Sequence, residues 1–410
     1  MGPAAGPRGG LTPASPGAAA GPGTGGIRGA LRTARFDRHE LSGSLGDLGT
    51  FLPLLTGMAA ANGLDFAAGL FFAGVFNLLT GLAFSIPMAV QPMKAIAAVA
   101  LAEGLTPAQI VAAGATVSLV VLVLGVTGLI DGISRALPKS VVRGLQLGLG
   151  LTLLGRGLGM VASTGTWLAP DSYLTGIAAA TVVAALFLSR TVPAALVLFG
   201  AGVALALWKD PRLAASLSLG FDLPSWSPPA WKDFTASFPK AALPQIPLTI
   251  LNSVVAVCAL SADLFPDRRA EPKRVAVSVG AMNLAAAWFG AMPMCHGAGG
   301  LAGQYRFGAR TNGSVLFLGA VKMLLAVLFG ASLMALCRAF PASVLGVMLG
   351  ISGLDLAAVA RDQRAPRDAI VMIATAGGCL LLGDFTLGFL AGLGLALVLR
   401  FAVPPRAAER

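Results

Sequence analysis

The sequence predicts an all-α membrane protein that crosses the bilayer many times and is built from two inverted repeats of seven segments. The first observation is composition: 56% of the 410 residues are hydrophobic and only 11% are charged, whereas soluble domains carry about 25% charged residues. A soluble fold of this size cannot cover so much apolar surface, so lipid must solvate much of it. The apolar runs are continuous, unlike the alternating segments of about ten residues that form membrane β-barrels, and therefore indicate helices.

The second observation is the order of the apolar runs. We expect segments at 44–61, 66–86, 92–102, 107–130, 139–158, 172–189, 192–208, 244–262, 275–291, 297–304, 313–335, 342–358, 368–383 and 385–402. The runs 92–102 and 297–304 are shorter than the roughly 20 residues that a straight spanning helix needs. The pattern therefore predicts about 12–14 transmembrane segments, two of which are half-helices that meet at the midplane.

The third observation is an internal repeat. Residues 74–88 read G-V-F-N-L, eight residues and then P-M, and residues 280–294 read G-A-M-N-L, eight residues and then P-M. Further matches pair Pro138-Lys-Ser-Val with Pro341-Ala-Ser-Val, and Pro53-Leu-Leu-Thr with Pro247-Leu-Thr. Four matches in the same order indicate two homologous halves, and an odd number of segments in each half inverts the second half in the membrane.

These observations divide the chain into five parts. We expect a disordered cytoplasmic tail (1–40), a first repeat (41–208), an extracytoplasmic connector (209–243), a second repeat (244–402) and a short cytoplasmic tail (403–410). Prolines in the first tail interrupt any apolar core that a signal peptide would need.

The basic residues indicate topology rather than nucleic-acid binding. The formal net charge is +11, but the Lys and Arg residues are scattered between apolar runs, without a basic patch that contains aromatic residues. With a cytoplasmic N-terminus, 21 of the 29 Lys and Arg fall on the cytoplasmic side, as the positive-inside rule requires. We expect a multi-pass protein of the bacterial inner membrane with both termini in the cytoplasm. The four cysteines lie in or beside apolar segments and do not indicate a disulfide framework.

Two tracts hold backbone-breaking residues at membrane depth: "IPMAVQPMKAIAAVAL" (86–101) and "AMPMCHGAGGLAGQY" (291–305). Irregular backbone is tolerated there only where protein buries it or where it lines a cavity. Inverted half-helices direct their N-terminal amides and positive dipole ends into one volume, which suits an anion. The candidate substrate-binding residues are Gln91, Pro92, Met93, Lys94, Cys295, His296, Gly297, Ala298, Gly299 and Gly300.

The hypothesis of an anion-binding site depends mainly on Lys94. A charge at the bilayer centre costs on the order of +3 kcal/mol on insertion scales, and a cation in the first turn of a helix also opposes the dipole. A bound anion would offset both penalties. Alternatively, Lys94 snorkels to the membrane surface or pairs with Asp47 or Glu103. Gln91 and His296 would add neutral donors, although His296 is equally well explained as a buried structural histidine.

Further polar residues are expected to support the site. Asp47 is an intramembrane acid, which indicates either a functional role or a brace for the unwound backbone. Asn77 and Asn283 are expected to hydrogen-bond between helices. Gln304 is expected to support the second half-helix. Arg306 and Arg310 are expected at the cytoplasmic mouth, as topology anchors or steering charges.

Three stretches resemble the molybdate transporter family, distant relatives of the SulP sulfate permeases. They are "GSLGDLGTFLPLL" (43–55), "PMAVQPMKAIAAVAL" (87–101) and "PMCHGAGGLAGQYRFGARTNG" (293–313), and the resemblance covers most of residues 41–400. It implies molybdate uptake by a core domain (41–130 and 244–335) that shifts like an elevator against a gate domain (131–208 and 336–402). It implies neither a cofactor nor a metal site.

Other functions stay open at this stage. Sulfate is also a tetrahedral dianion, so a sulfate or general oxyanion transporter is the main alternative, and an anion channel is the second. An intramembrane enzyme is disfavoured, because the chain has two histidines and lacks H-E-x-x-H and Walker motifs. The expected partners are a small oxyanion (molybdate, tungstate or sulfate) and membrane lipid, with a homodimer left open.

Overall fold

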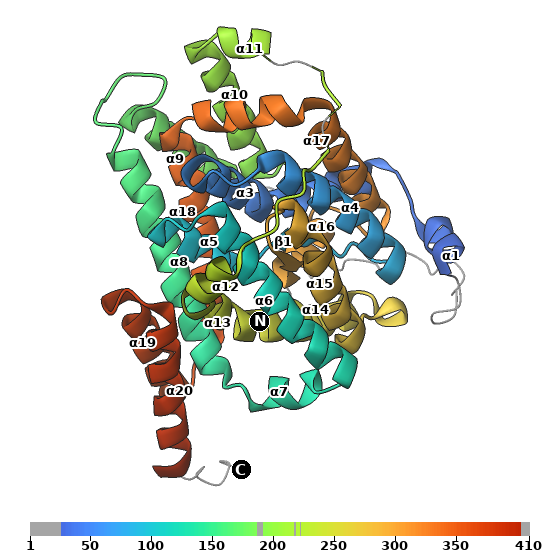
Figure 1. Ribbon diagram of the computed structural model, residues 1–410, viewed down its shortest axis with the longest axis vertical. Coiled ribbons are helices and arrows are strands. Elements are labelled where there is room, and N and C mark those ends of the chain that lie inside the picture. Colours follow the sequence, from blue (N-terminus) through green and yellow to red (C-terminus); the bar gives the residue numbers. More distant parts are fainter. Residues whose placement is uncertain (1–25, 187–191, 217–218, 222, 403–410) are drawn as a thin grey trace, which may run out of the picture.

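The computed structural model describes residues 26–186, 192–216, 219–221 and 223–402, and it is built almost entirely of helices (Figure 1). The first half contains α3 (Leu48–Asn62), α4 (Phe66–Phe84), β1 (Val90–Pro92), α5 (Lys94–Glu103), α6 (Pro107–Thr127), α8 (Lys139–Ala162), α9 (Tyr173–Leu186) and α10 (Ala194–Lys209). These helices form seven segments, in the order predicted from the apolar runs.

The second half also contains seven segments. Its first segment runs without interruption through α12 (Trp231–Ser237), η2 (Phe238–Ala242), α13 (Leu243–Leu248), η3 (Thr249–Val255) and α14 (Ala256–Leu264). The others are α15 (Pro272–Ala286), α16 (Ala298–Arg306), preceded by β2 (Met294–His296), α17 (Gly313–Ala339), α18 (Ala342–Ala358), α19 (Pro366–Leu381) and α20 (Phe385–Ala402). Short helices connect or flank these segments: α1 (Gly26–Thr33), α2 (Arg38–Ser44), η1 (Leu45–Asp47), α7 (Ile130–Ala136), α11 (Arg212–Ser216), η4 (Pro266–Arg268), η5 (Ala287–Phe289) and η6 (Val359–Asp362).

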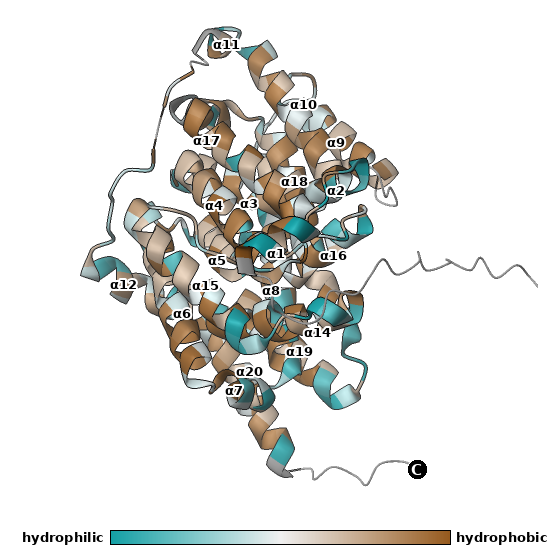
Figure 2. Ribbon diagram, turned by 90° about the vertical axis from the view of Figure 1, so that its right-hand side faces the viewer, coloured by the Kyte–Doolittle hydropathy of each residue, from teal (hydrophilic) through white to brown (hydrophobic). Residues whose placement is uncertain are grey.

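Among the described residues, six helices are long and apolar enough to cross a membrane. By contrast, α5 has ten residues and α16 has nine, which at 1.5 Å per residue is about half of a hydrocarbon core. Hydrophilic residues gather around α1, α2 and the ends of α14 and α16, whereas the long helices are mainly hydrophobic (Figure 2). The chain is therefore a multi-pass membrane protein with two half-helices, as predicted.

Helix packing repeats between the two halves. Helix α4 packs along α17, and the corresponding helices of the opposite halves, α15 and α6, pack along each other. The matched glycines Gly74 and Gly280 lie at these two contacts. A Cβ at Gly74 would be 2.6 Å from the Met323 nitrogen, and one at Gly280 would be 2.5 Å from the Leu122 Cβ. The repeated sequence motif therefore marks an equivalent close helix contact in each half.

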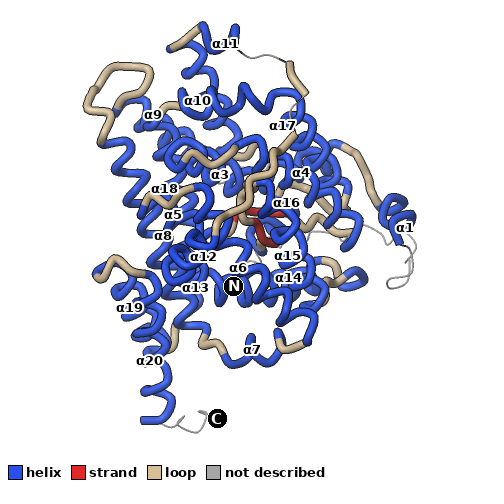
Figure 3. Tube along the Cα trace, viewed as in Figure 1, coloured by secondary structure: helices blue, strands red, loops and turns tan. Residues whose placement is uncertain are grey.

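The two halves meet in a short antiparallel strand pair at the centre of the molecule (Figure 3). Val90 lies opposite His296, Gln91 opposite Cys295, and Pro92 opposite Met294. The half-helices α5 and α16 start directly after these strands. Helices α8, α9, α19 and α20 lie to the left of this centre in Figure 1, and α4 and α14–α17 lie to the right.

The first segment of the second half begins earlier than the sequence predicts. We expected a connector up to residue 243, but the helix starts at Trp231 and continues through Pro239, Pro244 and Pro247. Two π-helical turns, η2 and η3, lie in this segment. They change the hydrogen-bond pattern locally, so that the helix passes its prolines without ending.

The N-terminal region also differs from the predicted disordered tail of residues 1–40. Residues 26–33 and 38–44 are helical, while residues 1–25 and the predicted tail 403–410 lie outside the described part of the chain. Asp37 caps α2 by accepting hydrogen bonds from the N–H groups of His39 and Glu40. The buried Glu40 carboxylate accepts from the N–H groups of Arg310 and Thr311, both at 2.8 Å. Contacts between residues about 270 positions apart in sequence thus order this region.

Candidate anion-binding site

Two asparagines hold the unwound backbone that precedes each half-helix. The Asn77 side-chain oxygen accepts a hydrogen bond from the N–H of Val90 at 3.0 Å. Asn283 pairs with Met294 twice, accepting from its N–H at 2.7 Å and donating to its carbonyl at 2.6 Å. Both side chains therefore replace hydrogen bonds that a continuous helix would make within itself. This is more specific than the helix-to-helix role that we predicted for them.

The side chains of the strand pair lie in two different environments. Opposed residues of an antiparallel pair point to the same face, and Gln91 and Cys295 both line one small pocket between the two halves. His296 is fully buried away from that pocket, where its Nε2 lies 2.9 Å from the Ser278 hydroxyl and its ring packs edge-on against Phe84. This position matches the structural alternative for His296 rather than the ligand role.

The N-terminus of α5 is capped by a side chain from the other half. The Gln245 side-chain oxygen accepts hydrogen bonds from the N–H groups of Ala95 at 2.8 Å and Ile96 at 3.3 Å. The Gln245 amide nitrogen in turn donates to Thr249 at 2.9 Å. Two of the N-terminal amides that the sequence assigned to an anion are thus already occupied. Sequence reasoning missed Gln245, whose only local signal is a polar residue between two prolines in an apolar run.

Lys94 lies in the first turn of α5 and lines the central cavity. Neither of the acids proposed as its partner is available, because Glu103 pairs with Lys240 at 3.0 Å and Asp47 pairs with Lys322 at 3.6 Å. Within the described ranges, no ion pair or hydrogen bond involves the Lys94 ammonium. A cation that faces a cavity at membrane depth without a protein partner is costly, and an anion in the cavity would reduce that cost.

The N-terminus of α16 is built from glycine. The position that a Cβ of Gly299 would take lies 3.9 Å from the Lys94 ammonium, and a Cβ at Gly297 would overlap the side-chain oxygen of Gln91. Gly46 and Gly303 contact each other through their backbones so closely that a Cβ on either would overlap the other. The glycines therefore let α16 approach both Lys94 and η1. In the described part of the chain, no side chain caps α16.

A cavity of about 400 Å³ surrounds these groups. Its walls come from both halves and from both helix groups seen in Figure 1. Gln91, Lys94, Gly299 and Arg306 line it on one side, and Gln146 of α8 and Asp355 of α18 line it on the other. A small pocket lined by Gln245, Ser253, Cys295 and Gly297 adjoins this cavity, and the two share Gln91, Lys94 and Gln146 in their walls. Gln146 and Asp355 were not predicted, because the sequence does not show that α8 and α18 face the half-helices.

Behind this cavity lies a buried charge pair. Asp47 and Lys322 are 0% and 2% exposed, and their charged atoms are 3.6 Å apart. The other Asp47 oxygen accepts a hydrogen bond from the Gln91 amide nitrogen at 2.7 Å. The Lys322 ammonium lies 3.5 Å from the centre of the Phe51 ring, a cation–π contact. Lys322 interrupts an apolar run, so its charge at membrane depth was a usable signal. The predicted site residues did not include it.

The remaining predicted residues lie around the site rather than in the cavity. Pro92, Met93, Ala298 and Gly300 do not line it. The Gln304 oxygen accepts from the Ser314 hydroxyl at 2.7 Å. Arg310 donates to the carbonyl groups of Tyr305 and Ala309, and its guanidinium stacks 3.6 Å from the Tyr305 ring centre. Arg310 therefore braces the end of α16, whereas Arg306 reaches the cavity wall.

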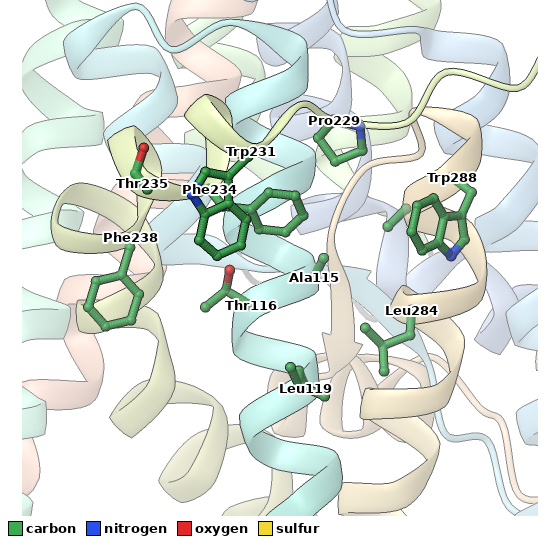
Figure 4. Close-up of a pocket in the computed structure, with 11 residues that line it drawn as sticks. Ala115, Thr116, Leu119, Pro229, Trp231, Phe234, Thr235, Phe238, Leu284 and Trp288 are labelled. Carbon is green, nitrogen blue, oxygen red and sulfur yellow. The ribbon is translucent and has the colours of Figure 1, made fainter.

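A second cavity, of about 540 Å³, has a different chemistry. It lies between α6, α12 with η2, and the end of α15 with η5, and Figure 4 shows Trp231, Phe234, Leu119 and Trp288 among the side chains that surround it. No charged residue in the described part of the chain lines it. An anion in this cavity would lose its hydration without compensation, so its greater volume does not make it the anion site.

The fold defines a class: a multi-pass membrane protein with two inverted repeats and paired half-helices. The transmembrane domain of the cyanobacterial bicarbonate transporter BicA has a similar fold, with a TM-score of 0.64 and 18% identity, covering 88% of this chain and 99% of that one. The structure of SLC26A9 is also similar, with a TM-score of 0.65 and 14% identity, covering 90% of this chain and 66% of that one.

Sequence comparison identifies the family. Residues 39–153 and 237–356 match the family model described as "Molybdate transporter of MFS superfamily". The chain is 39% identical to molybdate transporter 2 of Arabidopsis thaliana, covering 91% of this chain and 90% of that protein. It is 35% identical to molybdate transporter 1 of Chlamydomonas reinhardtii, covering 89% and 92%. The chain therefore belongs to the molybdate transporter family. These relatives are named as transporters, not as enzymes.

Proposed function

We propose that this protein is a secondary active transporter that takes up molybdate and binds it between the starts of α5 and α16. The observation that carries the proposal is the Lys94 ammonium, which faces the cavity without a protein partner in the described residues and lies beside the uncapped glycine turn of α16. The names of the relatives supply the substrate. The cavity chemistry supports an anion, because its wall combines the Lys94 ammonium, the Arg306 guanidinium, neutral amides and a helix N-terminus with a single carboxylate, that of Asp355.

We propose an elevator-like mechanism, in which the half-helices and their supporting helices (41–130 and 244–335) move against the gate (131–208 and 336–402). The cavity lies at the boundary of these two groups, with Lys94 and Gly299 on one side and Gln146 and Asp355 on the other. A displacement along this boundary would carry the site from one side of the membrane to the other without rebuilding it. The distribution of basic residues supports a cytoplasmic location for both termini.

Sulfate is the main alternative substrate, because a site made of one ammonium and backbone amides distinguishes anions by charge and size. Tungstate is nearly the same size as molybdate and should compete strongly for uptake, while the smaller sulfate should compete less in a rigid cavity. Competition by tungstate and sulfate against labelled molybdate in proteoliposomes distinguishes the two assignments. Equal inhibition by both at matched concentrations would replace the molybdate assignment with a general oxyanion carrier.

Lys94→Ala tests the site itself. Molybdate should raise the melting temperature of the wild type, since a ligand at 100 times its Kd stabilises a protein by about 2.7 kcal/mol. Lys94→Ala should lose this shift and the uptake, and its ligand-free form should be slightly more stable because an unpaired buried charge is gone. Lys94→Arg should keep part of the activity at best, because a forked guanidinium replaces a compact ammonium.

Lys240→Ala is the matched control, since Lys240 pairs with Glu103 and 53% of its side chain is exposed. It should keep both the molybdate-dependent shift and the uptake. An unchanged shift and normal uptake in Lys94→Ala would remove Lys94 from the binding site.

A further inference from the structure

The buried acid behind the cavity points to a binding site for the coupling ion, an inference that rests on the proposed oxyanion transport. We propose that Asp47 binds one proton together with the oxyanion, and that this proton sets the orientation of the Gln91 carboxamide toward the substrate. Nothing in the family relationship names a coupling ion, and the contacts of these side chains carry the inference.

The orientation of Gln91 follows from its contact with Asp47. Its amide nitrogen donates to an Asp47 carboxylate oxygen at 2.7 Å, so its carbonyl oxygen points the other way, toward Gly297 at the cavity. That oxygen is buried and has no hydrogen-bond partner in the described part of the chain. In this state Gln91 presents an acceptor, not a donor, on the side where the oxyanion would bind.

Protonation of Asp47 reverses this preference. A carboxylate accepts hydrogen bonds only, so it requires the amide nitrogen of Gln91, whereas a protonated carboxyl group can donate to the amide oxygen. The side chain can then turn over, because its oxygen and nitrogen occupy nearly equivalent positions. Its NH₂ group would face Gly297 and donate to an oxyanion oxygen. The proton is taken from water as the oxyanion binds and returned to water as it leaves, and only an O–H bond forms and breaks.

The charges around the site also favour the uptake of one proton with each oxyanion. Lys94, Lys322 and Asp47 carry a net charge of +1 when Asp47 is ionised, and the opposite charges of Arg306 and Asp355 at the cavity wall cancel each other. This leaves one negative charge uncompensated when a dianion binds. Protonation of Asp47 raises the sum to +2 and matches a tetrahedral dianion such as molybdate. Uncompensated charge is expensive in a buried site, so oxyanion binding and proton binding should promote each other.

Other groups near Asp47 do not replace this role. Charged or titratable residues on the elements packed around it include Lys322 on α17, Lys94 and Glu103 on α5, Cys295 and His296 on β2, Tyr305 and Arg306 on α16, Asp355 on α18, and Arg38, His39 and Glu40 on α2. In the described ranges, Lys322 is the one within ion-pair distance of Asp47. Because its ammonium already lies beside the carboxylate, a sodium ion would meet a like charge there.

Proton uptake by the wild type tests the inference without any substitution. Molybdate is added to purified protein in weakly buffered detergent solution containing a pH indicator, at mildly alkaline pH where free molybdate is a dianion. We expect one proton to be taken up for each molybdate bound, and binding to weaken as pH rises, approaching tenfold per pH unit once Asp47 is ionised in the free protein. Molybdate binding without proton uptake would overturn the proton site and leave the proposed function intact. No molybdate binding at any pH would overturn the proposed function instead.

Asp47→Asn tests whether Asp47 is the residue that binds the proton. The amide that this substitution introduces can donate to the Gln91 oxygen permanently, so molybdate binding should continue and lose most of its pH dependence, while uptake driven by a pH gradient should fall to background. Asp355→Asn neutralises the other acid at the same cavity and tests the rival position, where the pH dependence should remain. The control is Asp131→Asn, which neutralises an exposed acid of α7 outside the cavity. If the pH dependence disappears in Asp355→Asn and persists in Asp47→Asn, the inference is wrong. Uptake driven by a sodium gradient, with no response to a pH gradient, would also contradict it.

Discussion

The starts of α5 and α16 occupy equivalent places in the two halves, yet they contribute different chemical groups to the same cavity. At α5, Lys94 contributes a full charge, and Gln245 already caps the amides of Ala95 and Ile96. At α16, the first turn carries no charge, its N-cap residue Gly297 has no side chain, and no cap from another side chain is found in the described part of the chain. One half therefore provides charge, and the other provides space and free N–H groups.

There is a physical reason why the charge and the open backbone lie on different half-helices. Two charged half-helices would place two unpaired cations in one low-dielectric volume, which is costly whenever the site is empty. Two open glycine turns would attract an anion only through the dipoles of their helices, and each dipole contributes about 0.3–2 kcal/mol. A single ammonium that faces an open helix N-terminus combines attraction for the anion with a limited cost in the empty state.

Moving the charge from α5 to α16 is the change with the largest expected effect. Lys94→Ala should weaken molybdate binding by about 100-fold, since a hydrogen bond to a charged group contributes up to about 3 kcal/mol. Adding Gly299→Lys to that variant should restore part of the affinity, because its Cβ would start 3.9 Å from the original ammonium position. Isothermal titration with molybdate measures both effects, with Lys94→Ala/Gly299→Ala as the control. If the double variant binds no better than this control, the position of the charge matters and not only its presence.

Filling the open turn of α16 should have the next largest effect. Gly297→Ala places a methyl group where Gln91 lies, and overpacking of this kind costs about 1–3 kcal/mol. Both thermal stability and molybdate affinity should fall. Gly49→Ala is the matched control, because Gly49 lines the same cavity and has open space for a Cβ. Equal behaviour of the two variants in thermal unfolding and binding would show that glycine is not required at the start of α16.

Removing the cap of α5 should affect stability more than binding. Gln245→Ala frees two buried amides, and loss of a helix cap typically costs about 0.5–2 kcal/mol, whereas the charge of Lys94 remains. We expect a lower melting temperature and a change in molybdate affinity of less than about threefold, which is under 1 kcal/mol. Gln109→Ala removes a comparable but exposed cap at Thr106 and should cost less. A collapse of binding in Gln245→Ala would mean that the cap belongs to the anion site.

The smallest effect is expected away from both half-helices, at the ion pair of Arg143 and Asp362, whose charged atoms lie 2.6 Å apart with 46% of the Asp362 side chain exposed. Asp362→Asn should cost about 0.2–1 kcal/mol at low ionic strength, as is usual for pairs at the surface. The cost should shrink at high salt, because dissolved ions screen exposed charges. Melting curves at low and high salt measure this difference, and unchanged molybdate affinity separates the pair from the site. A cost that does not respond to salt would mean that packing or neutral hydrogen bonds, rather than charge, hold these two side chains together.

The sequence alone predicted the fold closely, because its signals are local and strong. In lipid, each spanning segment must be a long apolar helix, so the runs that became α4, α6, α17 and α18 could be located from hydrophobicity. The prolines and glycines around Lys94 and Gly299 likewise required broken helices at membrane depth. The repeat around Asn77 and Asn283 then placed the two breaks in equivalent positions, and hence together.

Only the tertiary structure decided what each polar side chain contacts. Lys94 had two candidate acids in the sequence, and it pairs with neither, because Lys240 and Lys322 pair with those acids instead. The face of β2 to which each side chain points depends on its register with β1, which turns Cys295 toward the cavity and His296 away from it. These outcomes depend on contacts between residues far apart in the chain, such as Gln245 with the start of α5. Hydrophobicity and periodicity report the local environment of a segment, and they carry no information about which distant partner reaches it.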